Sequence, residues 1–146
     1  MANQRELNIL LVEDDDVDVR AIQRAFKQRK FTNPMYVAHD GIEALEVLRG
    51  ENGQDPIPRP YIILLDLQLP RMTGLEFLAQ LRKDPELTRS IVIVLTTSDN
   101  DKDICEAYDQ HIAGYLLKRD TGTDFVNVIQ MIEPFSIAVQ FPPDKS

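Results

Sequence analysis

The stretch NILLVEDDDVD, residues 8–18, joins four apolar residues directly to four consecutive acids. A short apolar run of this kind is typical of a strand that is buried on both faces. The acids Glu13 to Asp16 would then place dense negative charge at the end of that strand. Acidic side chains favour the first turn of a helix, so the end of the run is expected to begin one, with Asp15 or Asp16 as its N-cap.

The same alternation of short apolar runs and helical periods continues along the chain, and it predicts an α/β fold. A five-stranded parallel sheet with helices on both faces would follow from it. The strands are expected at Asn8–Val12, Met35–Ala38, Tyr61–Leu67, Ile91–Thr96 and Gly114–Leu117. The intervening helices are marked by Val17, Ile22, Ala25 and Phe26; by Ile42, Ala44, Leu45 and Leu48; by Leu75, Leu78 and Leu81; by residues 101–110; and by Phe125, Val128, Ile129 and Ile132.

Composition narrows the class of protein. The 146 residues suit one domain, and the formal net charge of −8 argues against a nucleic-acid partner, whose phosphates attract basic surfaces. No apolar run approaches the ~20 residues that cross a bilayer, and the N-terminus does not resemble a secretory signal. The lone cysteine, Cys105, suits a reducing compartment and is expected to be a small buried group. We therefore expect a cytoplasmic protein that does not associate with membranes.

Polar residues follow four of the five expected strands. Glu13 and Asp14 come after the first strand, Asp66 interrupts the third, Thr96 ends the fourth and Lys118 follows the fifth. The carboxyl ends of parallel strands share one edge of a sheet, and ligands bind at that edge. These side chains are therefore expected to meet.

A group of carboxylates at one edge needs either a cation or strongly raised pKa values, because like charges in close contact repel one another. Mg²⁺ fits best, since it binds one or two carboxylates and bridges to phosphate. A lysine and a threonine hydroxyl would complete a site for a phosphoryl group. An aspartate beside the metal could then form an aspartyl-phosphate.

Four motifs carry a resemblance to a known family: ILLVEDD (9–15), LLDLQLPRMTG (64–74), VLTTS (94–98) and GYLLK (114–118). In this order they resemble a response-regulator receiver domain of the CheY type, over roughly residues 7 to 133. The resemblance implies a flavodoxin-like sheet with strand order 2-1-3-4-5. It also implies roles for seven residues: Asp66 as phosphoacceptor; Glu13, Asp14, Asp66 and the backbone carbonyl of Gln68 as Mg²⁺ ligands; Thr96 and Lys118 as phosphoryl contacts; and Thr96 and Tyr115 as switch residues.

One departure from the family concerns the residue after Lys118, which is usually proline, often with a cis peptide bond, and here is Arg119. This departure leaves the loop geometry open. Together with the Pro-rich loop at 48–60, it resembles single-domain receivers that serve phytochrome-like sensor kinases. The partners implied are such a kinase and, for onward transfer, a histidine phosphotransfer protein.

The expected function is therefore that of a response regulator in a two-component phosphorelay, a signalling protein and not an enzyme. Phosphorylation of Asp66 would shift the surface around the fourth helix, fifth strand and fifth helix. An aspartate-nucleophile phosphatase is one alternative, but it needs an Asp two residues after its nucleophile, where this chain has Gln68. A flavin-binding flavodoxin-like protein is another, but the acids after the first strand would repel a flavin phosphate.

The C-terminal stretch FSIAVQF (135–141) alternates large and small residues. Its period is closer to two than to 3.6, which predicts an extra strand or arm after a receiver domain of residues 1–134. Residues 135–146 would then be an extension. Two alternatives remain open: the arm packs on a second subunit and forms a homodimer, or it folds back over its own domain.

Overall fold

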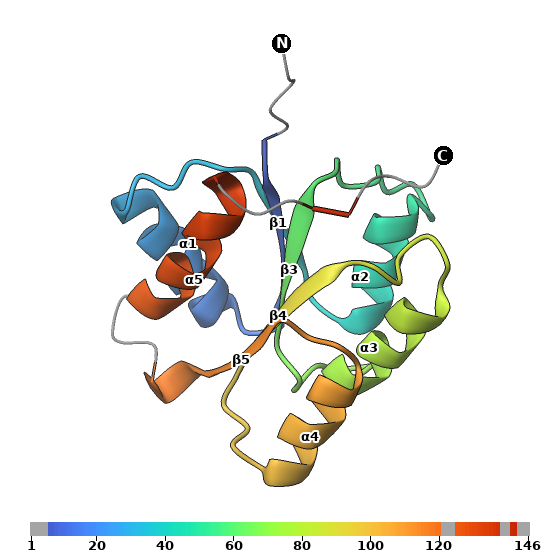
Figure 1. Cartoon of the computed structure of the whole chain (residues 1–146). Coiled ribbons are helices and arrows are strands. Elements are labelled where there is room, and N and C mark those ends of the chain that lie inside the picture. The colour runs from blue at the N-terminus through green and yellow to red at the C-terminus, as the bar shows by residue number, and fades with distance from the viewer. Residues whose placement is uncertain (1–5, 121–124, 138–140, 143–146) are drawn as a thin grey trace.

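The structure is a computed structural model, and it describes residues 6–120, 125–137 and 141–142. Strands and helices alternate along the chain (Figure 1). The elements are β1 (Asn8–Val12), α1 (Asp16–Gln28), β2 (Met35–Ala38), α2 (Gly41–Arg49), β3 (Tyr61–Leu65), α3 (Gly74–Lys83), β4 (Ile91–Thr96), α4 (Asp101–Asp109), β5 (Gly114–Leu117), the 3₁₀ turn η1 (Lys118–Asp120) and α5 (Val126–Ile137). Within these ranges no helix is long and apolar enough to cross a membrane.

The five strands form one parallel sheet in the order β2-β1-β3-β4-β5, so the predicted fold class and strand order are confirmed. Four strands have the predicted bounds. The third ends at Leu65 and not at Leu67, because the backbone turns at Asp66. The carboxylate of Asp66 accepts a hydrogen bond from the N–H of Gln68, at 3.0 Å, and such local bonds compete with strand pairing.

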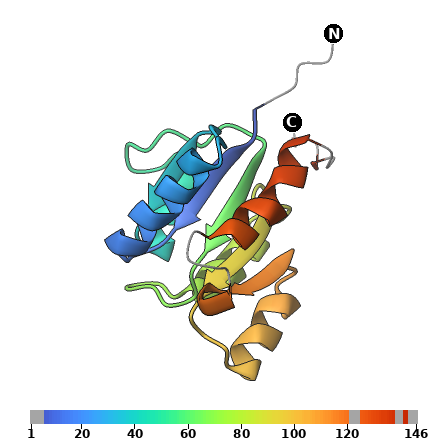
Figure 2. The ribbon, with the colours of Figure 1, turned by 90° about the vertical axis from the view of Figure 1, so that its left-hand side faces the viewer.

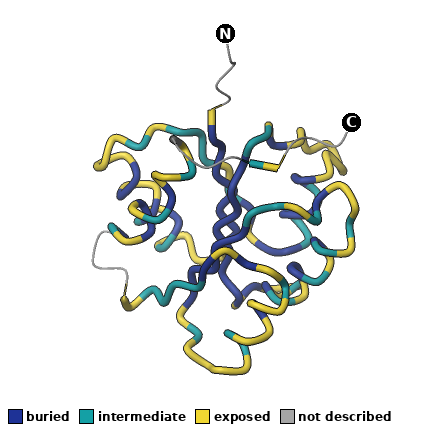
Figure 3. Tube along the Cα trace, viewed as in Figure 1, coloured by how far each residue is buried: buried dark blue, intermediate teal, exposed yellow. Residues whose placement is uncertain are grey.

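Successive strand residues serve opposite faces of the sheet. Ile9 and Leu11 pack with α1 and α5, whereas Leu10 and Val12 pack with the layer of α2 and α3. Figures 1 and 2 show α1 and α5 covering one face and α2, α3 and α4 on the other. The strands are the most buried part of the molecule (Figure 3). Both faces of a parallel sheet are thus covered, as the apolar runs predicted.

Side-chain caps begin four of the helices, and at α4 the cap is Asn100, which accepts a hydrogen bond from the N–H of Lys102. Asp15 is the N-cap of α1, as predicted, and accepts hydrogen bonds from the N–H groups of Val17 and Asp18. Asp40 caps α2, and Thr73 and Glu76 form a capping box on α3. Val17 was expected on the apolar face of the first helix, but it is 65% exposed. The buried face begins instead at Val19, which precedes Ile22 by one turn.

The helix α3 also carries a cation that joins the ends of several loops. The Arg82 guanidinium donates hydrogen bonds of 2.6–3.0 Å to four backbone carbonyls, those of Thr88, Ser90, Gln110 and His111. Ser90 directly precedes β4, and His111 lies shortly before β5. Arg82 therefore fixes the amino ends of these two strands, opposite the edge where the predicted site lies.

Two further predictions made from the sequence are wrong. The helix α5 continues through Pro134 to Ile137, so Phe135 belongs to a helix and not to a strand or arm. Phe135 follows Ile132 by three residues and packs on the same apolar core, so helical burial outweighs the one hydrogen bond that proline cannot donate. Residues 138–140 and 143–146 lie outside the described residues. Cys105 is exposed and not buried, because it lies on the outer side of α4.

Candidate functional site

Glu13 and Asp66 directly follow β1 and β3, and each continues the hydrogen bonding of the sheet by one residue. The N–H of Glu13 donates to the carbonyl of Ala38 at 2.9 Å, and that of Asp66 donates to the carbonyl of Val12 at 3.0 Å. Both carboxylates are therefore fixed by backbone bonds at the carboxyl edge of neighbouring strands. Glu13 is 2% exposed and Asp66 is 5% exposed. Buried acids of this kind need partners.

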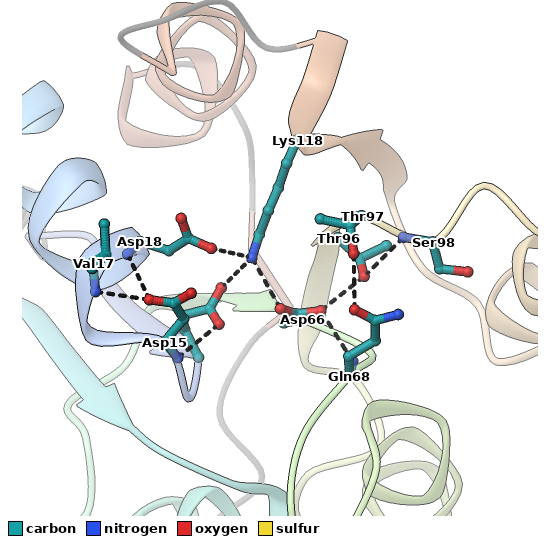
Figure 4. A network of polar contacts seen from close by, with 10 residues as sticks. Asp15, Val17, Asp18, Asp66, Gln68, Thr96, Thr97, Ser98 and Lys118 are labelled. Carbon is teal, nitrogen blue, oxygen red and sulfur yellow. Dashed lines mark hydrogen bonds and ion pairs between the residues drawn. The ribbon is translucent and has the colours of Figure 1, made fainter.

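The main partner is Lys118, directly after β5 (Figure 4). Its Nζ lies 2.7 Å from Oε1 of Glu13, 3.0 Å from Oδ2 of Asp66 and 2.6 Å from Oδ2 of Asp18. Residues from three parts of the chain, more than 50 positions apart, thus meet at one ammonium group. The predicted convergence of Glu13, Asp66 and Lys118 is present in the structure.

The other oxygen of Asp66 faces β4. Its Oδ1 accepts a hydrogen bond from the Thr96 hydroxyl at 2.7 Å and from the Gln68 N–H at 3.0 Å. Thr96 is fully buried, so its hydroxyl is aimed at the carboxylate and not at solvent. Asp66 is therefore held on one side by a cation and on the other by two neutral donors.

The pKa values of Glu13 and Lys118 are both raised, but for different physical reasons. Burial and the nearby charge of Asp66 together raise the pKa of Glu13 to about 7, against the opposing hydrogen bond from Lys118. Burial alone would lower the pKa of Lys118, but the hydrogen bonds that its ammonium donates to Asp18 and Glu13 and the charge of Asp66 outweigh burial and raise that pKa. The ammonium therefore stays charged and balances the buried carboxylates.

Asp14, the third predicted carboxylate, is exposed. In the part of the chain that the structure describes, no three His, Cys, Asp or Glu side chains form a ready-made metal cluster. Glu13 and Asp66 face Lys118, which supplies positive charge. The donor set still fits Mg²⁺, because carboxylate and carbonyl oxygens are the ligands it prefers and because the buried negative charge at Glu13 and Asp66 favours a cation.

A second layer of polar contacts covers the site from the β4–α4 side. The Thr97 hydroxyl donates to the side-chain oxygen of Gln68 at 2.8 Å. The Tyr115 hydroxyl donates to the carbonyl of Ser98 at 2.7 Å, and the Ser98 hydroxyl donates to Asp103 at 2.7 Å. Tyr115 is thus joined to Ser98, which lies two residues after Thr96 in the same segment.

The loops beside the site are also fixed. Arg71, at a φ of 62°, donates to Asp40 at 2.8 Å and joins the loop after β3 to the start of α2. A Cβ on Gly74 would lie 2.5 Å from the Cα of Leu67, so only glycine fits where α3 begins. Across the described residues the one cis peptide bond is Arg59–Pro60, which leaves Lys118–Arg119 trans. Arg119 pairs instead with Asp99 at 2.9 Å.

Sequence reasoning missed Asp18. It assigned the later acids of the run to the start of a helix, and Asp18 does lie in the first turn of α1. The signal that could have found it is position, because Asp18 follows Asp14 by four residues. A residue one turn into a helix that leaves the functional edge can still reach back toward that edge.

Comparisons with known proteins agree with this geometry. A family profile described as "Response regulator receiver domain" matches residues 9–130. Response regulator Rcp1 of Synechocystis is 39% identical over 127 residues, which are 87% of this chain and 86% of Rcp1. The crystal structure of the Mn(2+)-bound form of Rcp1 matches with a TM-score of 0.81 and 36% identity, over 95% of this chain and all of that one.

Two further solved structures are similar. The phosphorylated cyanobacterial phytochrome response regulator RcpA matches with a TM-score of 0.83 and 36% identity, over 95% of this chain and 100% of RcpA. Response regulator RPA3017, described as acting in red light signaling of R. palustris, matches with a TM-score of 0.79 and 30% identity, over 93% of this chain and 98% of that one.

Proposed function

The chain belongs to the family of response regulator receiver domains of two-component signalling, and from this premise we propose that Asp66 is its phosphoacceptor. The observation that carries the proposal is the position of Asp66, which is a buried carboxylate between the Lys118 ammonium and the Thr96 hydroxyl. Both groups already lie within hydrogen-bond distance of the atoms that would carry the phosphoryl group. Family membership replaces the phosphatase and flavodoxin hypotheses.

The proposed reaction is a phosphoryl transfer from a phosphohistidine. A carboxylate oxygen of Asp66 forms the new O–P bond as the N–P bond breaks, and the electron pair of that bond stays on the imidazole of the donor. Lys118 places positive charge beside the oxygens of the transferred group, and Thr96 donates a hydrogen bond to one of them. The chain supplies the acceptor and assists its own phosphorylation, but it turns over no substrate.

Glu13, Asp14, Asp66 and the backbone carbonyl of Gln68 would hold Mg²⁺ at the same edge. A bound divalent ion would neutralise charge on the carboxylates and on the phosphoryl oxygens. The existence of a Mn²⁺-bound form of Rcp1 supports the proposal that this chain binds a divalent ion.

The readout of phosphorylation is proposed to pass through Thr96 and Tyr115. A phosphoryl group on Asp66 would compete for the Thr96 hydroxyl, and the segment from Thr96 to Ser98 is bonded to Tyr115. Tyr115 also lines a groove of about 290 Å³ between α4, β5 and α5, with Ile104, Tyr108, Leu116, Leu117, Asp120 and Asn127. Phosphorylation would shift the population between two conformations of this surface, and one of them would bind the next protein in the pathway.

The proposed donor is a phytochrome-like sensor histidine kinase, and a histidine phosphotransfer protein is the proposed acceptor for onward transfer. The descriptions of RcpA and RPA3017, which name phytochrome and red light signaling, support this class of kinase. The chain's net charge of −8 favours protein partners over nucleic acid.

The test is the mass of the intact protein after incubation with acetyl phosphate, with Mg²⁺ and with a chelator. We expect one phosphoryl group on the unchanged chain with Mg²⁺, and little without it. Asp66→Asn should abolish labelling, whereas Asp55→Asn, the same change in an exposed loop, should not. Stoichiometric labelling of Asp66→Asn would contradict the assignment.

A separate proposal concerns the residues after Pro134. Phe135 and Phe141 lie with their ring centroids 6.1 Å apart, and both pack on the core beneath α1 and α5. This favours folding back over the chain's own domain, and not an arm that forms a homodimer. Light scattering of the full chain and of a chain ending at Ile137, which keeps α5 complete, should give monomer masses for both. A dimer that only the full chain forms would restore the dimerisation arm.

A further inference from the structure

Three carboxylates contact the Lys118 ammonium, and the proposed function gives them different roles. Glu13 and Asp66 are proposed metal ligands, and Asp66 also accepts the phosphoryl group. Asp18 has neither role, yet its contact with Nζ is the shortest of the three, at 2.6 Å. Figure 4 shows Asp18 approaching the ammonium from α1, on the side away from Thr96.

We propose that Asp18 is a positioning residue, which holds the Lys118 ammonium beside Asp66 while Glu13 and Asp66 bind a divalent cation. The inference rests on the proposed function of Asp66, and it adds a part that the site residues named above do not include.

Competition between cations is the first argument. A divalent ion at Glu13 and Asp66 would take up the negative charge that those two carboxylates otherwise share with Lys118. The lysine side chain is a flexible four-carbon stem with a compact charge, so its position depends on the anions around it. Asp18 is an anion that is not among the proposed metal ligands. The ammonium can then stay near Asp66 while both cations are bound.

Rigidity is the second argument. Asp18 lies in the first turn of α1, where the Asp15 carboxylate accepts hydrogen bonds from the N–H groups of Val17 and Asp18. One turn further on, Ile22 is fully buried in the core between the sheet and α1. A carboxylate on a capped and packed helix keeps its place better than one on a loop. The Asp18 side chain is only 28% exposed, and the Lys118 side chain is 10% exposed.

The first test compares Asp18→Asn with Asp16→Asn. Both variants remove one negative charge from the first turn of α1, but Asp16 is exposed and lies two positions away, off the face that meets Lys118. With acetyl phosphate and Mg²⁺, Asp18→Asn should label about ten-fold more slowly than the unchanged chain, as loss of a charge-assisted hydrogen bond predicts. Asp16→Asn should stay within about two-fold of it. Equal rates for the two variants would overturn the proposal.

A second pair of variants guards against a simple loss of folding. Asp18→Glu and Asp18→Gln have nearly the same size and differ in charge, so their difference measures the ion pair itself. Asp18→Glu should label several-fold faster than Asp18→Gln, because the longer carboxylate can still reach the ammonium. Equal labelling by both, with equal thermal stability, would count against a positioning role.

The third measurement needs no phosphorylation. The ammonium protons of Lys118 can be followed by ¹H–¹⁵N NMR of the lysine Nζ groups, assigned with Lys118→Arg. When Mg²⁺ is added, the signal should persist in the unchanged chain and in Asp16→Asn, and it should be lost to solvent exchange in Asp18→Asn. A signal that persists equally in all three would overturn the inference. Failure of the unchanged chain to label at Asp66 would refute the proposed function alone, since this NMR comparison stands without it.

Discussion

Two cations at opposite ends of the sheet are held in different ways. Arg82 donates to four neutral backbone carbonyls at the amino ends of β4 and β5. Lys118 contacts three carboxylates at the carboxyl edge. The carbonyls are neutral backbone groups, whereas the carboxylates are anions that can exchange the ammonium for a metal ion. The first arrangement therefore serves stability, and the second is suited to change its partners during function.

Lys118→Ala should have the largest effect on function. It removes the positive charge beside Asp66 and Glu13, and loss of one such group in a transition state costs about 10²–10³-fold in rate. The rate of labelling by acetyl phosphate with Mg²⁺ measures this. Lys102→Ala, which removes an exposed lysine on α4, is the matched control. If Lys118→Ala labelled as fast as the control, Lys118 would be as structural as Arg82.

Arg82→Ala should have the largest effect on stability. Four carbonyls would lose a charged donor, and we expect the free energy of unfolding to fall by about 2–3 kcal/mol. Urea unfolding measures the loss, with Arg89→Ala, an exposed arginine in the following loop, as control. Labelling of the folded variant should be unchanged. A large loss of labelling without loss of stability would mean that Arg82, like Lys118, serves function.

The ion pair between Asp40 and Arg71 gives a third case for comparison, because it lies at the functional edge but is not proposed to exchange its partner. Burial disfavours the Asp40 carboxylate, but the hydrogen bonds from Arg71 and from the N–H of Glu43 outweigh burial and hold its pKa below the ordinary value of 3.8. A lowered pKa means that the folded state binds the proton less readily. The stability it contributes is therefore present above pH 3.8 and is lost as the pH falls through the lowered pKa.

Asp40→Asn keeps a good N-cap but removes this charge. We expect the variant to lose about 1 kcal/mol of unfolding free energy at pH 7. Urea unfolding at several pH values should show the gap to the unchanged chain narrowing as the pH falls below 3.8. A gap that stays constant with pH would mean that packing, and not the ion pair with Arg71, accounts for the loss.

Tyr115→Phe should have the smallest effect. It removes one hydrogen bond to the Ser98 carbonyl and keeps the ring, so stability should fall by about 0.5–1 kcal/mol. The labelling rate at Asp66 should be unchanged, because the hydroxyl does not touch the carboxylate. Chemical-shift changes around α4 on phosphorylation should weaken. A strong loss of labelling would instead place Tyr115 with Lys118 in the chemistry.

Much of this fold could be predicted because each strand is a short apolar run and each helix has its own period. The meeting of Glu13, Asp66, Thr96 and Lys118 followed from parallel strands, whose carboxyl ends share an edge. Contacts that depend on side-chain reach could not be predicted. Asp18 looked like one more helix-starting acid, and only the reach of the Lys118 side chain from the end of β5 to the first turn of α1 brings the two together.

The error at the C-terminus has a different cause. Two periods overlap in residues 135–141, and local alternation favoured a strand. The apolar spacing of the preceding helix in fact continues to Phe135, and burial against the core decided the outcome. A sequence pattern near proline is therefore better judged over the whole preceding helix than over the next few residues.

The central place of β3 has one more consequence. Ile62 and Leu64 belong to the core under α1 and α5, and Ile63 and Leu65 belong to the core under α2 and α3. The amide protons of this strand should be the last to exchange with deuterium, since they open only when both halves come apart. Phosphorylation of Asp66, which directly follows β3, would change contacts at the carboxyl edge of the sheet without opening this strand. The signalling state and the resistance to unfolding can therefore be tuned by separate mutations in one small protein.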